Sequence, residues 1–156
     1  VYLFGLPLEE ILFFVTVPYS CLFIYETIKL YIPEKPLPFN KNYYYLAGAV
    51  LIMAAGNYSS QYYTSTVMIF SAAFLMVAAT FKPAILQSRV YWLSILITYL
   101  PFLLVNYFLT APPIVWYSPE AIWGMRFTTI PVEDFFYSFS MISWWFFFYL
   151  LFKKEI

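Results

Sequence analysis

Leu6-Pro7-Leu8-Glu9-Glu10-Ile11-Leu12-Phe13-Phe14 and Ile130-Pro131-Val132-Glu133-Asp134-Phe135-Phe136-Tyr137 are two versions of one motif. Each version has a proline, one aliphatic residue, two adjacent carboxylates and then an aromatic-rich apolar run. The second proline follows the first by 124 residues, and the two motifs hold four of the eight acidic residues in the chain. A carboxylate pair at the start of a membrane helix is costly to keep, so its repetition indicates a chemical role.

The composition is that of an integral membrane protein. Of the 156 residues, 63% are hydrophobic, 25% are aromatic and only 10% are charged. Soluble domains are about half apolar and about a quarter charged. A soluble chain of this length has too small an interior to bury so much apolar surface.

Several classes of site are excluded by the residues that the chain lacks. It has no histidine and one cysteine, Cys21, so a histidine-bound metal, a cysteine metal site and an internal disulfide are not expected. The four glycines do not have the spacing of a nucleotide-binding loop, so no cofactor is expected. The net charge is zero, which argues against nucleic acid as a partner. General acid–base chemistry would then fall to carboxylates, tyrosines, lysines or Cys21.

Charge-free runs and proline-rich loops predict an all-α bundle of five membrane-spanning helices, over residues 7–32, 43–57, 61–81, 90–110 and 131–152. Proline suits a first helical turn, so Pro7 and Pro131 are expected to begin the first and last helices. The small residues of 43–57 should let that helix pack closely on its neighbour. The chain starts at Val1, almost on the first motif, so we expect earlier helices to be missing.

The basic residues predict an orientation. With five spans, a single basic residue, Arg126, falls on the side of the motifs, and seven fall on the other side: Lys29, Lys35, Lys41, Lys82, Arg89, Lys153 and Lys154. The positive-inside rule makes the seven-charge side cytoplasmic. The first and last helices are then parallel, as a pseudo-symmetric repeat, in the cell membrane. Both motifs open on the non-cytoplasmic side, at the same depth as Asn57, Gln61 and Asn106.

Structural roles are the alternative for these polar residues. One isolated motif would fit a helix cap at the headgroup boundary, but two copies fit it less well. Arg126 fits a headgroup anchor as well as a site residue. Asn57 and Asn106 could make helix-packing hydrogen bonds, which is the favoured interpretation for Asn57. Most aromatic residues are expected to contact lipid or other helices.

Three aromatic residues share a helix face with a motif carboxylate four positions earlier: Phe13 with Glu9, Phe14 with Glu10 and Tyr137 with Glu133. A carboxylic acid beside aromatic rings suits carbocation chemistry, in which the acid protonates an alkene and ring faces stabilise the cation by about 2 kcal/mol. Adjacent carboxylates cannot easily both ionise in a low dielectric, so one stays protonated as the acid. Arg126 could hold another ionised as the base. We expect Glu9 and Glu133 to face the substrate.

The paired motifs resemble those of the small membrane-embedded lycopene cyclases, which occur as two subunits or as one fused chain of two similar domains. The segments 113–117 and 124–127 before the second motif, and Leu104-Val105-Asn106, are also similar to that family. The resemblance implies that residues 1–32 end a first cyclase-like repeat and that residues 33–156 form a second. Fused members are longer at the N-terminus, in line with missing helices.

The resemblance implies an isomerase (intramolecular lyase) that closes the acyclic ends of lycopene into β-ionone rings without net redox change. It assigns the catalytic role to the motif carboxylates: Glu9, Glu10, Glu133 and Asp134. The substrate and its cation would be held by Phe13, Phe14 and Tyr137, with support from Pro7, Pro131, Arg126 and Asn106. Partners would be the carotenoid substrate, the bilayer, and a second copy or other carotenoid-pathway enzymes. The division into acid and base, the ring type and the number of rings stay open.

Two other functions fit some of these features. A small proton-coupled transporter also has intramembrane carboxylates and repeats, but a proton relay needs ionisable groups along the membrane depth. The four motif carboxylates lie at one level, and Glu26 is the only deeper one on the first helix. A non-catalytic subunit of a carotenoid enzyme complex would give no product when expressed alone.

Overall fold

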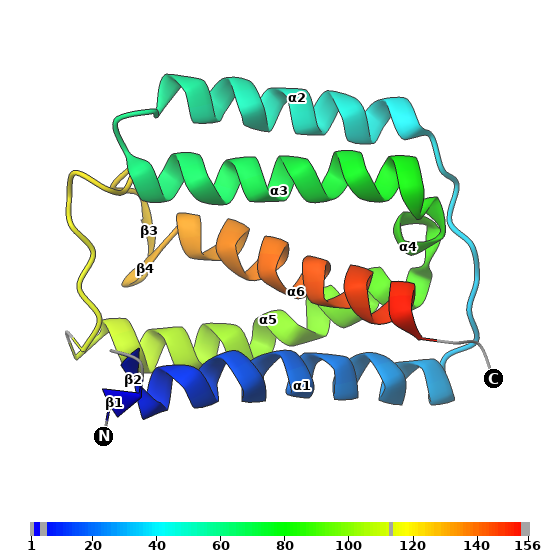
Figure 1. Ribbon diagram of the computed structural model, residues 1–156, viewed down its shortest axis with the longest axis horizontal. Coiled ribbons are helices and arrows are strands. Elements are labelled where there is room, and N and C mark those ends of the chain that lie inside the picture. The colour runs from blue at the N-terminus through cyan, green and yellow to red at the C-terminus, as the bar shows by residue number, and fades with distance from the viewer. Residues whose placement is uncertain (1, 4–5, 113, 154–156) are drawn as a thin grey trace.

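Six helices form about three quarters of the described chain, as an α-helical membrane bundle (Figure 1). The computed structural model describes residues 2–3, 6–112 and 114–153, apart from the side chains of Tyr2, Leu3, Leu6, Pro7, Glu9 and Glu10. The helices are α1 (Leu8–Tyr31), α2 (Lys41–Asn57), α3 (Tyr62–Phe81), α4 (Pro83–Gln87), α5 (Arg89–Thr110) and α6 (Glu133–Phe152). The short α4 was not predicted, because the segment 82–89 looked like a loop.

Local capping explains where two of the helices begin. The Asn40 side chain accepts a hydrogen bond from the Asn42 amide before α2, and the Ser88 hydroxyl accepts one from the Tyr91 amide before α5. Such caps satisfy amides that have no partner inside the helix. Helices α1 and α5 continue through Pro18 and Pro101.

Each motif helix is preceded by the same small antiparallel strand pair, whose second strand is the start of the motif. Strands β1 (Tyr2–Leu3) and β2 (Leu6–Pro7) precede α1, and β3 (Arg126–Phe127) and β4 (Ile130–Pro131) precede α6. The registers Tyr2↔Pro7 and Arg126↔Pro131 correspond, again at an offset of 124 residues. The prediction that the two prolines begin the helices was wrong. Each proline ends a strand, because a proline has no amide to donate and its fixed φ also suits extended chain.

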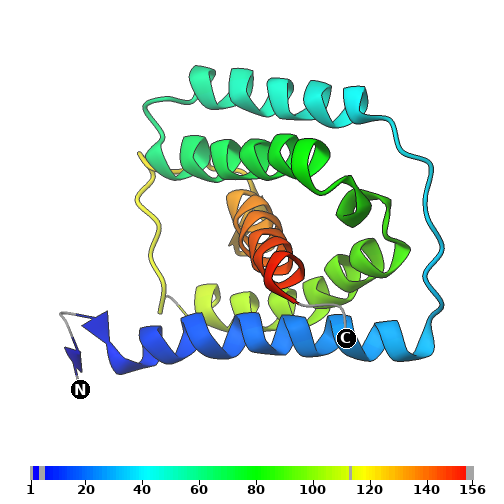
Figure 2. The same cartoon turned by 45° about the vertical axis from the view of Figure 1, so that its right-hand side comes forward.

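Helix α6 lies in the middle of the bundle, with α3 on one side and α1 and α5 on the other (Figures 1 and 2). The core beside it contains the fully buried Phe74, Tyr91 and Phe146. The Tyr91 hydroxyl lies 2.8 Å from the Ser143 hydroxyl, which ties α5 to α6. Helices α1, α3 and α6 run in one direction, so both motifs begin their helices at the same end of the bundle.

Helix α2 forms a hairpin with α3 and packs on its outer side (Figure 1). A Cβ atom placed on Gly48 of α2 would lie 2.9 Å from the Met76 side chain of α3. The predicted close packing of this small-residue helix is therefore present. A turn around residues 58–61 joins the two helices, where the sequence predicted it.

Four of the described helices are long and apolar enough to cross a membrane, over Ile11–Tyr31, Tyr62–Phe81, Arg89–Thr110 and Glu133–Phe152. Helix α2 has 17 residues, or about 26 Å, slightly less than the ~30 Å hydrocarbon core. Large apolar side chains such as Leu30, 82% exposed, cover the outside of the bundle, as lipid contact requires.

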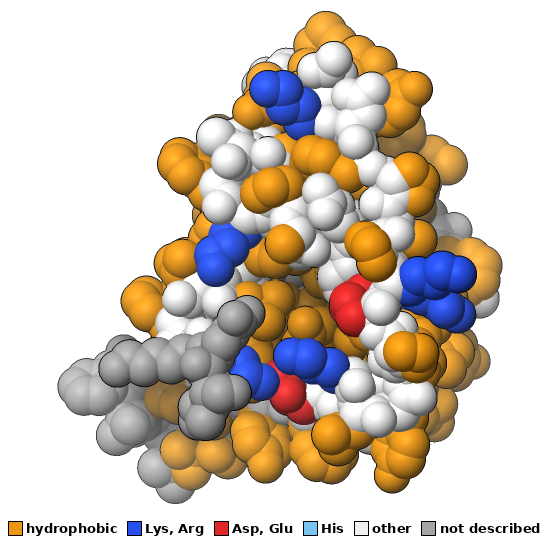
Figure 3. All heavy atoms as spheres, turned by 90° about the vertical axis from the view of Figure 1, so that its right-hand side faces the viewer, with side chains coloured by type: hydrophobic (Ala, Val, Ile, Leu, Met, Phe, Trp, Pro, Cys, Tyr) orange, Lys and Arg blue, Asp and Glu red, His pale blue; other side chains and the backbone are white. Residues whose placement is uncertain are grey.

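Charged side chains gather at the end of the bundle away from the motifs (Figure 3). Six of the seven basic residues predicted to share one side belong to elements at this end: Lys29, Lys35, Lys41, Lys82, Arg89 and Lys153. The seventh, Lys154, lies outside the described residues. Arg126 is at the opposite end, in β3 beside the second motif. The predicted separation of basic residues between the two ends is thus present in the described part of the chain.

Candidate active site

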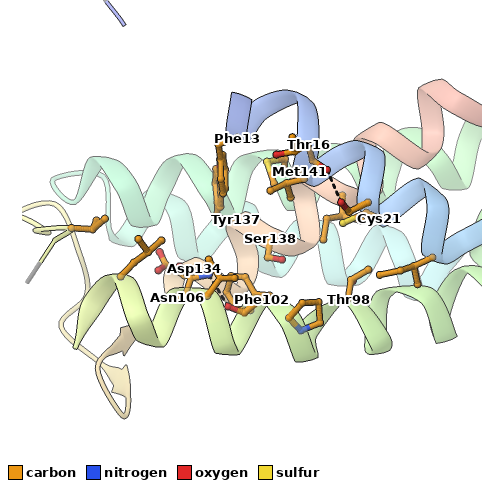
Figure 4. A pocket seen from close by; sticks show the side chains of 18 of the residues that line it. Phe13, Thr16, Cys21, Thr98, Phe102, Asn106, Asp134, Tyr137, Ser138 and Met141 are labelled. Atoms are coloured by element: carbon orange, nitrogen blue, oxygen red, sulfur yellow. Dashed lines mark hydrogen bonds between the residues drawn. The ribbon is translucent and has the colours of Figure 1, made fainter. Parts of the chain in front are cut away.

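A cavity of about 400 Å³ lies between α1, α5 and α6. Its walls are mostly apolar, and Asp134 of α6 lines it near the end where the motifs lie (Figure 4). Tyr63 at the start of α3 and Tyr117 in the connection between α5 and β3 also line this region. Helices α1 and α6, which follow the two motif prolines, therefore border one shared space.

Among the acidic residues with described side chains, Asp134 is the one that lines this cavity. It is only 2% exposed, and its two oxygens accept separate hydrogen bonds. The Tyr63 hydroxyl donates to Oδ1 at 2.7 Å, and the Tyr117 hydroxyl donates to Oδ2 at 2.7 Å. Hydrogen bonds to a charged group are about twice as strong as neutral ones, so two of them fix this carboxylate firmly.

Three tyrosine rings surround Asp134. The centroid of the Tyr63 ring lies 5.8 Å from that of Tyr117 and 6.4 Å from that of Tyr137. Burial raises the pKa of Tyr117, and its hydrogen bond to Asp134 adds to that rise. Its phenol therefore stays protonated near neutral pH and remains a donor. The result is a carboxylate fixed by two hydroxyls, with aromatic rings close to it.

Glu133 is buried at 1% exposure but does not line the cavity. Its Oε1 atom accepts a hydrogen bond from the Thr64 hydroxyl at 2.7 Å and another from the Trp123 amide. Its Oε2 atom is buried and has no hydrogen-bond partner among the described residues. Glu133 thus joins α6 to α3 and to the connection between α5 and β3.

Helix geometry explains why the adjacent carboxylates separate. Successive residues on an α-helix point about 100° apart, since each turn takes 3.6 residues. When Asp134 points into the cavity, Glu133 is turned toward α3. The structure therefore places Asp134 at the cavity, where the sequence had favoured Glu133. The side chains of Glu9 and Glu10 lie outside the described part of the structure. The expectation that Glu9 faces the substrate therefore stays a prediction.

The other predicted site residues divide between the cavity and its surroundings. Phe13, Asn106 and Tyr137 line the cavity (Figure 4), whereas Phe14 lines a separate groove. The Asn106 side chain donates to the Phe102 carbonyl of the same helix at 3.0 Å, so this hydrogen bond does not join α5 to another helix.

Arg126 and the two motif prolines belong to the strand pairs. The Arg126 guanidinium donates to the Thr129 carbonyl at 2.8 Å and is exposed, so its described contact closes the turn between β3 and β4. Thr128, in the same turn, has a φ of 57°, a backbone conformation that is costly for a β-branched side chain. The predicted contact between Arg126 and a carboxylate does not appear among the described hydrogen bonds.

Sequence reasoning did not identify four residues that hold the motif carboxylates: Tyr63, Thr64, Tyr117 and Trp123. Tyr63 and Thr64 follow the predicted turn at residues 57–61, so their depth in the membrane could have been inferred. Tyr117 lies in the segment 113–117 that resembles the family, but no feature of the sequence indicated that its hydroxyl or that of Tyr63 would bind Asp134. Trp123 binds Glu133 through its backbone amide, so its residue type does not indicate this contact.

The far end of the bundle holds a different polar contact. Lys153 Nζ lies 2.8 Å from Glu26 Oε1, and the hydrogen bond to Glu26 raises the pKa of Lys153. The Tyr149 hydroxyl also donates to Glu26 Oε1, at 3.0 Å. These contacts join the ends of α1 and α6. Among the described residues, no group of three acidic, cysteine or histidine side chains could hold a metal ion.

Comparison with known proteins gives one match. No curated protein and no solved structure matches the chain. A family model described as lycopene cyclase matches residues 1–28 and 60–152, which include both motifs and the residues that donate hydrogen bonds to the side chains of Glu133 and Asp134. The match covers most of the chain, which therefore belongs to the lycopene cyclase family.

Proposed function

We propose that this protein closes the acyclic end groups of lycopene into β-ionone rings by acid–base chemistry, forming β-carotene without net redox change. This makes it an isomerase of the intramolecular lyase type. The observation that carries the proposal is Asp134, fixed by two tyrosine hydroxyls in an apolar cavity between the two motif helices. Membership of the lycopene cyclase family supplies the substrate class.

Asp134 suits the role of the base. Both of its oxygens accept hydrogen bonds from tyrosine hydroxyls, which stabilise the charged form and hold the side chain in position, while burial opposes its ionisation. The acid would come from the first motif, Glu9 or Glu10. Glu9 precedes Phe13 by four residues on α1, and Phe13 lines the cavity.

The reaction balances with one proton delivered and one removed. The acid gives a proton to the terminal double bond of the end group, and the resulting cation is attacked by a neighbouring alkene to form the ring carbon–carbon bond. Asp134 then takes a proton from the carbon beside the new cation, which leaves the ring double bond. The rings of Phe13, Tyr63 and Tyr137 would stabilise the cation, at about 0.5–2 kcal/mol for each well-placed face.

Two similar units support the proposed repeat: the strand pair β1–β2 followed by α1, and the strand pair β3–β4 followed by α6. They have corresponding strand registers, and their helices run in the same direction. We take residues 1–32 as the end of one cyclase-like repeat and residues 33–156 as a second, with α2 as a fifth span. The basic end of the bundle would face the cytoplasm and the motif end the opposite side of the cell membrane.

Pigment analysis tests the proposed function. The complete gene is expressed in a host that accumulates lycopene, and the extracted carotenoids are separated by chromatography. Cyclic carotenoid is expected, with β-rings as its end groups. Unchanged lycopene beside folded protein in the membrane would instead favour a non-catalytic subunit, and acyclic pigment with proton transport in vesicles would favour a transporter.

The two tyrosines that bind Asp134 give a second prediction. Tyr63→Phe and Tyr117→Phe each remove one hydrogen bond to a charged group, worth about 1.5–3 kcal/mol, so each should slow cyclisation by roughly tenfold or more. The measurement is the rate of cyclic product formation per amount of folded protein. Tyr62→Phe is the matched control, since Tyr62 is adjacent in sequence but 77% exposed. Equal rates for all three variants would contradict a role for these hydroxyls.

A further inference from the structure

A second hollow, a groove of about 690 Å³, lies on the side of α6 that faces α3. Its walls come from the start of α1, from α3 and from α6, and they consist largely of aromatic rings. Four of these side chains are also substantially exposed on the outside of the bundle: Phe14, Phe70, Trp145 and Phe148. In a membrane, this groove therefore opens toward lipid.

The groove and the cavity share a wall. Tyr137 and Met141 of α6 line both hollows, and Figure 4 shows them with Phe13 at the cavity. On α1, Phe13 lines the cavity and the next residue, Phe14, lines the groove, with their ring centroids 5.7 Å apart. Met141 is unbranched and flexible, so this part of the wall can adapt to a ligand.

The cavity alone is too short for a carotenoid. Its lining on α1 runs from Phe13 to Ile24, which is about 16 Å of helix, whereas a carotenoid is a rod comparable with the ~30 Å hydrocarbon core. Beyond that point α1 and α6 pack together, with the Tyr25 and Phe146 rings 5.1 Å apart and the Glu26–Lys153 ion pair after them. A molecule whose end group lies beside Asp134 must therefore leave the cavity sideways.

We propose that the groove binds the polyene chain of the substrate whose end group lies in the cavity, with the chain passing beside Tyr137 and Met141. This inference rests on the proposed function for the identity of the ligand. The groove follows α6 from Tyr137 to Phe148, about 16 Å, so it can hold about half of the ~30 Å rod beyond the end group in the cavity. Aromatic faces along the groove suit a flat conjugated chain.

The test uses a variant that fills the groove without touching the cavity. Thr66 lies in the groove on α3, is exposed and does not line the cavity, so Thr66→Trp places a large ring there and leaves the core intact. Ile69→Trp is the matched control: Ile69 is also on α3, is 50% exposed and lies outside the groove lining. Both proteins are purified as the full chain, and size-exclusion elution checks that they are folded.

Two measurements are made on each variant. The first is the lycopene retained per protein after purification from a lycopene-accumulating host. The second is turnover of lycopene compared with turnover of a shorter acyclic isoprenoid that has the same reactive end group. We expect Thr66→Trp to lower lycopene retention and lycopene turnover about tenfold relative to Ile69→Trp, with turnover of the short substrate unchanged.

The outcomes separate the two proposals. Equal retention and turnover for the two variants, or equal slowing of long and short substrates, would overturn the groove as the chain site. The wild type could instead retain lycopene without forming cyclic product, and Thr66→Trp could abolish that retention. This result would overturn the proposed function and leave the groove inference standing.

Discussion

Asp134→Asn is expected to abolish formation of cyclic carotenoid while the protein still folds. The amide has nearly the shape of the carboxylate, but it cannot take up the proton that the ring-closing step releases. Loss of a positioned general base typically costs a factor of about 10²–10⁴ in rate. The amide also keeps one oxygen to accept from a tyrosine hydroxyl, so part of the hydrogen bonding seen in the structure remains.

The measurement is cyclic product per folded protein in a lycopene-accumulating host. Glu120→Gln is the control, because Glu120 is an exposed carboxylate in the connection that also carries Tyr117. The control should retain wild-type activity, which would show that removal of any nearby negative charge is not enough to stop the reaction. An Asp134→Asn protein that cyclises lycopene at the control rate would remove Asp134 from the chemistry.

The helices of this protein are largely predictable from its sequence because they follow from long apolar runs. The runs that contain Phe74, Tyr91 and Phe146 became helices within one or two residues of the predicted bounds. The strand pairs β1–β2 and β3–β4 were missed, since each strand has two residues and no alternating pattern. The positive φ of Thr128 could not be predicted either, because a β-branched residue does not indicate a turn of this kind.

The residues of the candidate site could be predicted from the motifs, but the arrangement of their side chains could not. The motifs identified Asp134 and Glu133 together, and only the rotation of α6 separates the one that lines the cavity from the one that does not. That rotation is decided by contacts far apart in sequence, such as Thr64 with Glu133 and Tyr91 with Ser143. A pattern of adjacent residues contains no information about such pairs.

Glu133→Ala is expected to destabilise the protein strongly, whereas Glu133→Gln is expected to keep both the fold and most of the activity. In the structure, Oε1 accepts hydrogen bonds from the Thr64 hydroxyl and the Trp123 amide. Alanine leaves both donors buried without an acceptor, at about 1–3 kcal/mol for each. Glutamine presents an amide oxygen that can accept from both. The alanine variant should therefore lower the unfolding temperature in detergent and loosen the connection that carries Tyr117.

Thr64→Val supplies the matched test of this interpretation. If Glu133 acts by joining α6 to α3, Glu133→Ala and Thr64→Val should be coupled, so that the double variant loses less stability than the two single variants added together. Glu133→Gln should then follow the wild type in the rate of cyclic product formation. A Glu133→Gln protein with unchanged stability and the same loss of activity as Asp134→Asn would contradict the separation of roles. Both carboxylates of the second motif would then have to act on the substrate, although only Asp134 lines the cavity.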